Sequence, residues 1–337
     1  MLHMTRNSLN DRAAWEKANV KLPEFDVQAV ADATAKAPIW VHFGAGNIFR
    51  GFVAVLQQRL LNEGLADRGI IAADTFDYDI IDKIYTPFDN LTMNVTLNAD
   101  ATTTREIIAS VTEGLRADST DEAMMHRLRE IFTSESLQMV SFTITEKGYA
   151  LYRADGTLLP IVEEDMANGP AKARHAMSMV AALLLARYEA GAAPVAVVSM
   201  DNCSHNGEKL SNSVRTVAEA WVKNGFAPQG FADYLSDPAK VSFPWSMIDK
   251  ITPRPAKSVE ESLAADGIAD MAPIKLLFSC FVFQTMFFLQ PHSHHIGDKI
   301  PLEAYSFSYF RHRNHKDMGS AAARAVDFSL LRFFRSI

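Results

Sequence analysis

The fold class of this chain is decided by residues 39–61, which read IWVHFGAGNIFRGFVAVLQQRLL. A short apolar run over residues 39–43 precedes a turn that contains glycines, and from residue 52 to residue 61 apolar side chains recur at helical spacing. Strand, glycine turn and helix in this order are typical of the first unit of a parallel sheet. The stretch therefore predicts an α/β protein.

The same alternation continues on both sides of this unit. We expect further strands at residues 69–73, 91–97, 137–145 and 193–200, and helices at residues 120–132, 171–190 and 206–223. Apolar runs of strand length that alternate with longer helical stretches indicate a mostly parallel sheet with flanking helices. The predicted architecture over residues 1–274 is thus a Rossmann-type domain.

The character of the sequence changes near residue 274. Residues 275–337 carry 10 of the 21 phenylalanines and 5 of the 10 histidines, and they are basic where the preceding part is acidic. An apolar run begins at residue 274 but is interrupted by polar side chains, and it is shorter than the roughly 20 residues that a membrane-spanning helix needs. We expect a dinucleotide-binding domain over residues 1–274 and a short anomalous tail over residues 275–337, truncated or out of frame.

Composition excludes several classes of protein. The chain has 337 residues, of which 48% are hydrophobic and 22% charged, with a formal net charge of −7. An acidic balance disfavours nucleic acid and anionic membranes as partners, since both attract clustered basic side chains. Cys203 and Cys280 are the only cysteines, too few for a disulfide framework or a four-thiolate zinc site. With no apolar leader in residues 1–22, we expect a cytoplasmic protein that acts on a small molecule.

The glycine turn is the first chemical signal. Gly44 and Gly46 would let backbone N–H groups approach a pyrophosphate, although Phe49 stands where a third glycine is usual. Asp74 ends the next predicted strand and would accept hydrogen bonds from ribose hydroxyls, which favours NAD over NADP. Asp77 in the same loop is a competing candidate. The alternative interpretation is an ordinary strand-to-helix turn.

Two further polar clusters follow predicted strands. Residues 197–207 read VVSMDNCSHNG, in which the Asn202 amide would hydrogen-bond a carbonyl that gains negative charge. The alternative is that Asp201, Asn202 or Asn206 only caps the next helix. Residues 241–253 contain Asp249, which would either orient substrate or pair with a neighbouring basic side chain, Lys250 or Arg254.

These clusters, in this order, resemble the polyol-specific long-chain dehydrogenases, also called the mannitol dehydrogenase family. The turn HFGAGNIFRG at residues 42–51 looks like the cofactor loop of that family. The segments TITEKGY at residues 143–149, DN at residues 201–202 and FPWSMIDKI at residues 243–251 are similar to its fructuronate reductase and mannitol 2-dehydrogenase branch.

The resemblance implies a metal-independent NAD(P)-dependent oxidoreductase that interconverts a secondary alcohol and a ketone on an open-chain hexonate or hexitol. It also implies a Rossmann-type domain followed by a helical domain, with substrate between them and NAD as the expected cofactor. The site residues carried over by motif position are Gly44, Gly46, Asn47, Phe49, Arg50 and Asp74 for the cofactor, and Asn202 and Asp249 for catalysis.

The chain departs from the family at the catalytic lysine. The family pattern is Lys, then Asn five positions on, then His three further, and neither Lys275, Lys299 nor Lys316 begins such a pattern. Histidines gather at residues 292–295, but no carboxylate or thiolate lies at suitable spacing, so we expect no metal site. The competing hypotheses are a truncated or frameshifted member that binds cofactor without activity and, from the turn alone, a Rossmann-like methyltransferase.

Overall fold

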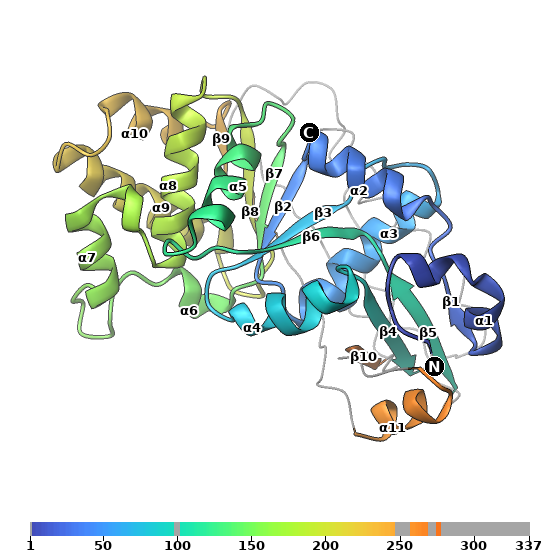
Figure 1. The fold of residues 1–337 in the computed structure, drawn as a ribbon. Helices are drawn as coiled ribbons and strands as arrows, with labels where there is room; N and C mark the ends of the chain where they lie inside the picture. The colour runs from blue at the N-terminus through green and yellow to red at the C-terminus, as the bar shows by residue number, and fades with distance from the viewer. Residues whose placement is uncertain (1, 98–101, 247–256, 269–273, 278–337) are drawn as a thin grey trace, which may run out of the picture.

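A computed structural model of the chain describes residues 2–97, 102–246, 257–268 and 274–277 (Figure 1). Its main sheet has six strands in the order β6-β3-β2-β7-β8-β9, and all five neighbouring pairs are parallel. The strands are β2 (Trp40–Phe43), β3 (Ile70–Asp74), β6 (Val111–Arg116), β7 (Met139–Phe142), β8 (Val195–Ser199) and β9 (Val241–Ser242). The predicted mostly parallel, Rossmann-type sheet is confirmed.

Helices cover both faces of the main sheet, which explains why β2, β3, β7 and β8 are apolar runs buried at every position. On one face lie α5 (Glu122–Thr133), α8 (Ala176–Glu189) and α9 (Asn206–Lys223), and their apolar sides form one core with Val41 and Phe43. On the other face α3 (Ala54–Asn62) and a π-helical segment, Phe49–Val53, form a second core with Trp40.

The remaining helices frame these layers. They are α1 (Arg12–Lys17), α2 (Val27–Lys36), α4 (Tyr78–Ile80), α6 (Thr145–Tyr149), α7 (Pro160–Asn168), α10 (Gln229–Ser236) and α11 (Lys257–Ala265), with a second π-helical segment at Ile81–Tyr85 and 3-10 turns at Asn7–Asn10, Thr86–Phe88 and Pro170–Lys172.

A second, smaller sheet has at its centre two strands from the segment between β3 and β6, and it is completed by one strand from each end of the described chain. Its order is β1-β5-β4-β10, with β1 (Val20–Lys21), β4 (Thr92–Leu97), β5 (Thr103–Ile108) and β10 (Ile274–Leu277). β4 and β5 are antiparallel, while β1 and β10 add at the two sides in parallel. The strand predicted at residues 91–97 therefore exists, but it pairs outside the main sheet (Figure 1).

The predicted helices are found, two of them with a later start: the helix predicted at residues 120–132 is α5, which begins at Glu122. The helix predicted at residues 206–223 is α9, whereas the one predicted from residue 171 begins at Ala176. The reason is local: the buried carboxylate of Asp165 accepts the N–H groups of Arg174 and His175, and the His175 Nδ1 atom accepts the N–H of Met177. The last of these bonds satisfies one free amide of the first turn, and the two bonds to Asp165 hold the residues just before the helix, so together they fix its start.

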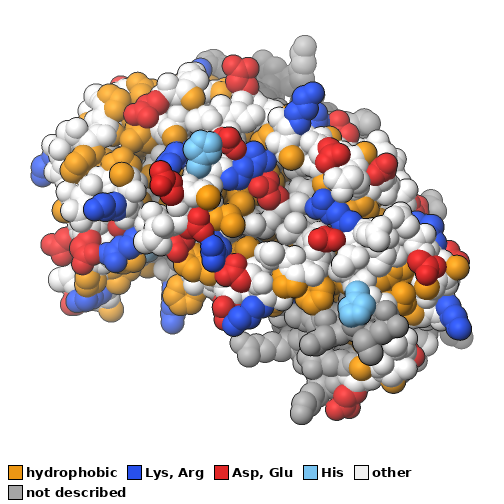
Figure 2. Space-filling view, viewed as in Figure 1, with side chains coloured by type: hydrophobic (Ala, Val, Ile, Leu, Met, Phe, Trp, Pro, Cys, Tyr) orange, Lys and Arg blue, Asp and Glu red, His pale blue; other side chains and the backbone are white. Residues whose placement is uncertain are grey.

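The surface is mixed in charge. On the face shown in Figure 2, acidic and basic side chains alternate over the described elements without gathering into one large patch of a single sign. Among the helices of the described ranges, none has the length and apolar character to cross a membrane. No group of three or more His, Cys, Asp or Glu side chains in those same ranges is placed to hold a metal ion.

Candidate active site at the carboxyl edge of the main sheet

The strand order places a topological switch point between β2 and β7. From β2 the chain proceeds outward through β3 and β6 on one side, and β7, β8 and β9 lie on the other. In open α/β sheets, ligands bind in the crevice beyond the carboxyl ends of the strands where the order reverses. The predicted glycine turn, which follows β2, lies at this point.

The fold requires a glycine at position 44, whether or not a ligand binds at the turn. Its backbone has φ +97°, a conformation that side chains with a Cβ rarely adopt, and an added Cβ would lie 2.2 Å from the carbonyl oxygen of Thr143. Its N–H donates to the carbonyl of Ala73 at the end of β3, at 2.9 Å. Gly44 thus lets the backbone turn sharply after β2, in the narrow space between the end of β3 and the residue that follows β7.

Two peptide groups of the turn are held by side chains. The Gly44 carbonyl accepts the Thr143 hydroxyl at 2.9 Å, and the N–H of the same peptide, from Ala45, donates to Asp74 Oδ2 at 3.0 Å. The Ala45 carbonyl accepts the Tyr85 hydroxyl at 3.1 Å. The orientation of both peptide planes is therefore set before any ligand arrives.

Gly46 differs from Gly44, because an added Cβ would meet nothing within 4 Å and its φ is not in the left-handed region. The Arg50 N–H donates to the Gly46 carbonyl at 3.0 Å, so the helical segment starts here. The N–H groups of Asn47, Ile48 and Phe49 fall in its first turn, where no intrahelical acceptor exists. Open space beside Gly46 and free amides at the positive end of a helix together form a cradle for an anionic group.

Phe49 and Arg50 are buried side chains that support the turn. Phe49 is fully buried and stacks on the His42 ring, with centroids 4.2 Å apart and planes 8° from parallel. The Arg50 guanidinium lies 5.9 Å from the centre of the Tyr85 ring, and burial lowers its pKa. Phe49, at the position where a third glycine is usual, begins a π-helical segment that extends to Val53.

Asp74 connects the turn to the loop after β3. It is 8% exposed, and its Oδ1 atom accepts the N–H groups of Phe76 and Asp77, each at 2.9 Å. With the bond from Ala45, three backbone amides converge on this carboxylate. Asp77, the competing candidate for a ribose ligand, is exposed in the same loop.

Asp201, after β8, binds the segment that follows β7. Its Oδ2 atom accepts the Tyr149 hydroxyl at 2.6 Å and the Ile144 N–H at 3.0 Å, while Oδ1 accepts the Thr145 N–H at 3.0 Å. These bonds hold Thr145 at φ +65°. Burial raises the pKa of Asp201 although three donors oppose the rise, and burial together with this carboxylate raises the pKa of Tyr149.

Asn206 connects the second predicted cluster to the third. Its amide nitrogen donates to the carbonyls of Ser246 at 2.8 Å and Asp201 at 3.0 Å, and its amide oxygen accepts the Ser246 N–H at 3.2 Å. The N-cap residue of α9 is His205, without a side-chain capping bond. The Asn206 amide oxygen also accepts the N–H of Gly207, in the first turn of α9, at 2.8 Å, so of the three candidates for a capping role Asn206 bonds a helix amide through its side chain, whereas the described bonds of Asp201 lead to the segment after β7.

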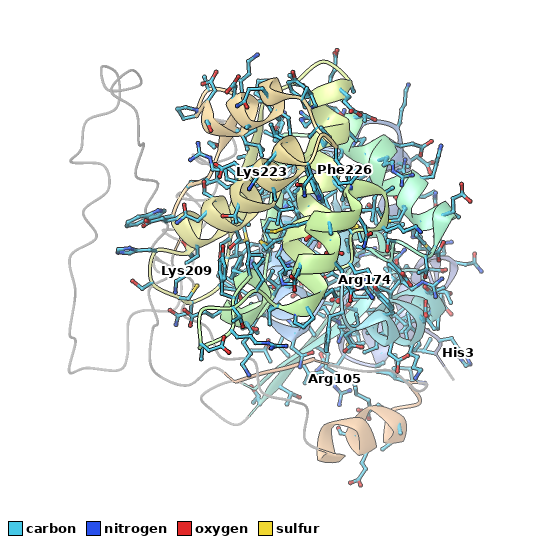
Figure 3. The ribbon with its side chains drawn as sticks, turned by 90° about the vertical axis from the view of Figure 1, so that its left-hand side faces the viewer. His3, Arg105, Arg174, Lys209, Lys223 and Phe226 are labelled. Atoms are coloured by element: carbon cyan, nitrogen blue, oxygen red, sulfur yellow. The ribbon has the colours of Figure 1, made fainter. Side chains whose placement is uncertain are left out.

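The three predicted clusters are thus brought to one edge of the sheet. Asn202 is exposed in the loop between β8 and α9, next to Asp201. On the outer side of that loop, Lys209 of α9 pairs with Glu146 of α6 (Figure 3). Asp249 and its possible partners Lys250 and Arg254 lie outside the described residues, as does the histidine group at residues 292–295.

Sequence reasoning missed the polar side chains buried inside the sheet. His42, Ser141 and Thr143 lie on β2, on β7 and just after β7, and they bond to one another. The feature of the sequence that could have indicated these side chains is His42, a histidine inside an apolar strand beside the glycine turn. It has meaning only once the register pairs His42 with Ser141.

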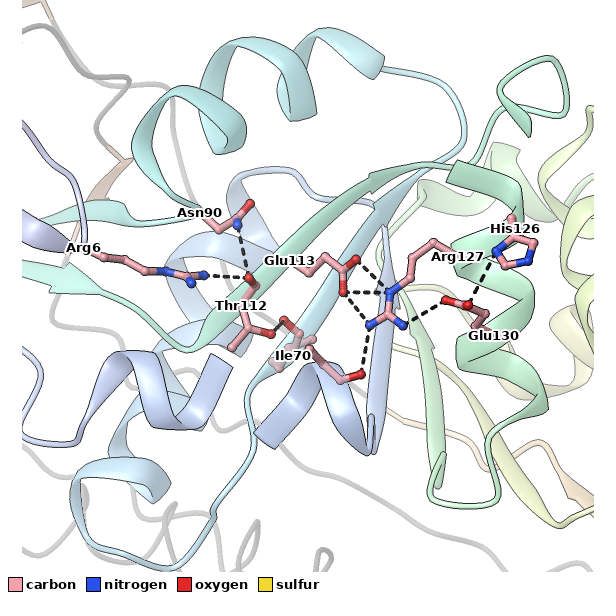
Figure 4. Close-up of polar contacts among 9 residues, drawn as sticks. Arg6, Ile70, Asn90, Thr112, Glu113, His126, Arg127 and Glu130 are labelled. Carbon is pink, nitrogen blue, oxygen red and sulfur yellow. Dashed lines mark hydrogen bonds and ion pairs between the residues drawn. The ribbon is translucent and has the colours of Figure 1, made fainter. Parts of the chain in front are cut away.

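A polar cavity of about 320 Å³ lies near the start of β6, away from the glycine turn. Its lining includes Arg127, whose guanidinium donates to Glu113 at 3.0 Å, to the Ala35 carbonyl at 3.2 Å and to Glu130 at 3.3 Å (Figure 4). Because protein acceptors already engage this guanidinium, the cavity is less suited to a charged ligand than the turn.

Comparison with known proteins decides the family. The sequence model described as the mannitol dehydrogenase Rossmann domain matches residues 38–285, which include the turn, both polar clusters and the whole main sheet. The chain belongs to the mannitol dehydrogenase family.

Members of the mannitol dehydrogenase family with high similarity include the D-mannonate oxidoreductase of Thermotoga maritima, 49% identical over 270 residues, covering 80% of this chain and 50% of the relative. The mannitol 2-dehydrogenase of Cereibacter sphaeroides is 31% identical over 255 residues, covering 72% and 49%. The chain therefore spans about half the length of the curated relatives it matches.

A solved structure in this family supports the fold. Mannitol 2-dehydrogenase of Pseudomonas fluorescens, in a ternary complex with NAD and D-mannitol, superposes with a TM-score of 0.64 at 26% identity, covering 77% of this chain and 50% of that one. D-sorbitol dehydrogenase in a substrate-free form gives the same TM-score at 25% identity, covering 77% and 51%.

Proposed function

We propose that this chain is the cofactor-binding part of a nicotinamide-dependent oxidoreductase that interconverts a secondary alcohol and a ketone on an open-chain hexonate or hexitol. The observation that carries the proposal is the turn after β2. Gly44 is demanded by the fold, whereas Gly46 leaves open space beside free amides at a helix start. That is the arrangement a pyrophosphate requires.

The substrate class is argued from relatives and the cofactor from charge. The D-mannonate oxidoreductase is more similar to this chain than the mannitol 2-dehydrogenase given above, which favours a hexonate of the D-mannonate/D-fructuronate type over the D-mannitol/D-fructose type. Asp74 and Asp77 place two carboxylates in the loop after β3, where they would repel the 2′-phosphate of NADP. We therefore propose NAD as the cofactor.

Each side chain has a role in this scheme. The turn from Gly44 to Arg50, including Asn47 and Phe49, binds the pyrophosphate, and Asp74 orders the loop that receives the ribose. Asn202 lies beside the reacting oxygen, and Asp249 lies near cofactor and substrate. A bound nicotinamide supplies or accepts the hydride, so this chain's residues have to orient the alcohol and remove its proton.

A second candidate function is cofactor binding without turnover. It is favoured by one observation, that neither Lys275, Lys299 nor Lys316 begins the Lys, Asn, His pattern of the family. Removal of a hydride from an alcohol needs a group that takes the hydroxyl proton, and a lysine of that pattern is the group the family uses. Binding and turnover therefore have to be measured separately.

Binding is tested by titrating the chain with NADH and following nicotinamide fluorescence. We expect Gly46→Ala to weaken NADH binding at least about tenfold, because the methyl group occupies the cradle, while the thermal midpoint stays unchanged. Gly44→Ala is the contrast, expected to lower the midpoint because its methyl group meets the Thr143 carbonyl. Equal NADH affinity of Gly46→Ala and the unsubstituted chain would contradict the cofactor site.

Turnover is tested by NADH oxidation with D-fructuronate and with D-fructose. Oxidation that is lost on Asn202→Ala supports the dehydrogenase, and the preferred ketone identifies the substrate class. NADH binding without oxidation of either ketone selects the second candidate. A chain that binds neither NADH nor NADPH contradicts both.

A further inference from the structure

A continuous chain of buried side-chain hydrogen bonds links β2 to β7 behind the turn. Trp40 Nε1 donates to Ser141 Oγ at 2.7 Å, and Ser141 Oγ lies 2.7 Å from His42 Nδ1. His42 Nε2 lies 2.9 Å from Thr143 Oγ1, and the Thr143 hydroxyl reaches the Gly44 carbonyl at 2.9 Å. His42 and Ser141 are direct partners in the strand register, so their side chains share one face of the sheet.

The partners fix the direction of every bond. Thr143 gives its hydroxyl proton to the Gly44 carbonyl, so its oxygen has to accept a proton from His42 Nε2. Burial lowers the pKa of His42 to about 3, so the ring is neutral and its Nδ1 atom is an acceptor. Ser141 then donates to Nδ1 while it accepts the Trp40 N–H. One tautomer, with the proton on Nε2, satisfies all four bonds.

This series of hydrogen bonds ends at the Gly44 carbonyl, which belongs to the peptide group that decides the geometry of the turn. The Gly44 carbonyl and the Ala45 N–H belong to one peptide plane, held at the oxygen by Thr143 and at the nitrogen by Asp74. The same His42 ring stacks on Phe49, in the first turn of the helical segment. His42 is therefore linked to the Gly44 peptide through Thr143 and contacts the first helical turn through Phe49, and Gly46 stands between these two points in the sequence.

We propose that His42 is a positioning residue of the cofactor site, which in its neutral Nε2–H form orients the Gly44 peptide through Thr143 and the first helical turn through Phe49. Its importance for ligand binding rests on the proposed function. The geometry of the turn itself does not, and the two are tested by different measurements.

The affinity test uses a matched pair at Thr143. Thr143→Ser keeps the hydroxyl and is expected to bind NADH within about twofold of the unsubstituted chain. Thr143→Val keeps the shape but has no hydroxyl, and the loss of one buried hydrogen-bond link is expected to weaken NADH binding about tenfold. Equal affinities of the two variants, both folded, would overturn the proposed role in binding.

The geometric test needs no cofactor. In the ¹⁵N-labelled chain at pH 7, two-bond nitrogen–proton correlations are expected to show His42 as the Nε2–H tautomer in the unsubstituted chain and in Thr143→Ser. The Ala45 amide is expected to exchange with solvent at least about tenfold faster in Thr143→Val than in Thr143→Ser. An Nδ1–H or doubly protonated ring, or equal exchange in the two variants, would overturn the proposal.

The outcomes separate the two claims. If the unsubstituted chain does not bind NADH but shows the expected tautomer and exchange difference, the proposed function fails and His42 still orients the turn. If NADH binds and the tautomer is wrong, only the inference about His42 fails. If Thr143→Val does not fold, the tautomer in the unsubstituted chain decides.

Discussion

At the scale of single residues, Arg187 connects three segments of the chain that are separate in sequence. Its side chain is buried, and its guanidinium donates five hydrogen bonds of 2.6 to 2.9 Å, all to backbone carbonyls. The carbonyls belong to Phe132, Ser134, Leu137, Ala193 and Pro194. One side chain thus provides hydrogen-bond donors for carbonyls at the end of α5 and in the segments that lead into β7 and β8.

We expect Arg187→Met to lower the free energy of unfolding by about 3 kcal/mol or more, because several buried carbonyls lose their donors at once. Urea unfolding followed by circular dichroism measures the change. Arg129→Met, at an exposed arginine of α5, is the control and should change stability by less than about 0.5 kcal/mol. Comparable effects of the two substitutions would show that the five bonds contribute little.

Residues whose role depends on local backbone could be predicted from the sequence, and residues whose role depends on register could not. The turn at Gly44 was predicted because a strand followed by a glycine turn has few structural solutions, and the roles of Gly44 and Gly46 in cofactor binding stay predictions. The partners of Asp201 and the tautomer of His42 depend on which residues face each other across strands that are far apart in sequence. Asp249 lies outside the described residues, and its role stays a prediction.

At the scale of elements, Asp201 clamps the start of α6 to the end of β8. We expect Asp201→Asn to cost about 2 to 4 kcal/mol of unfolding free energy, because an amide NH₂ would face donors where a carboxylate oxygen accepts them. The amides of Ile144 and Thr145 should then exchange faster with solvent. Native-state hydrogen exchange measures both effects.

The control for this clamp is Asp155→Asn, in an exposed turn where the Asp155 carboxylate accepts the Thr157 N–H. Asparagine makes the same kind of turn, so stability should change by less than about 0.5 kcal/mol. Unchanged exchange at Ile144 and Thr145 in Asp201→Asn would contradict the clamp.

The elements themselves were predicted well where their pattern was unambiguous. The helix at residues 206–223 and the strands β2, β3 and β8 were predicted from their apolar patterns, whereas β6 and β9 were not predicted, and the strand predicted at residues 137–145 ends at Phe142. The sequence could not show that the strand at residues 91–97 leaves the main sheet, because antiparallel pairing with β5 is a tertiary choice. β4 reads TMNVTL and β5 reads TTREII, so both carry polar residues that most strands of the main sheet lack.

At the scale of the whole molecule, the buried His42 ties stability to pH. Its pKa falls from 6.5 to about 3 on folding, so between these values the unfolded chain binds a proton that the native chain does not. Stability contributed by this residue is therefore lost as pH falls below 6.5, by about 1.4 kcal/mol per pH unit at most.

We expect urea unfolding between pH 7 and pH 4.5 to show this slope, and His42→Gln, which cannot take up the proton, to reduce it by about that amount. His126→Gln, which replaces an exposed histidine of α5, is the control for the histidine-to-glutamine substitution itself. A slope that is equal in His42→Gln and the unsubstituted chain would mean that His42 takes up its proton in the native state as readily as in the unfolded one.

The order of the strands along the chain also decides which of the two sheets has all its strands first during synthesis at the ribosome. All six strands of the main sheet have been made once residue 242 has emerged, whereas the small sheet waits for β10 at Ile274–Leu277. Until then the outer edge of β4 presents unpaired backbone groups, the kind of edge that recruits other chains. A nascent chain of this protein would thus hold all strands of the main sheet while the small sheet still lacks β10.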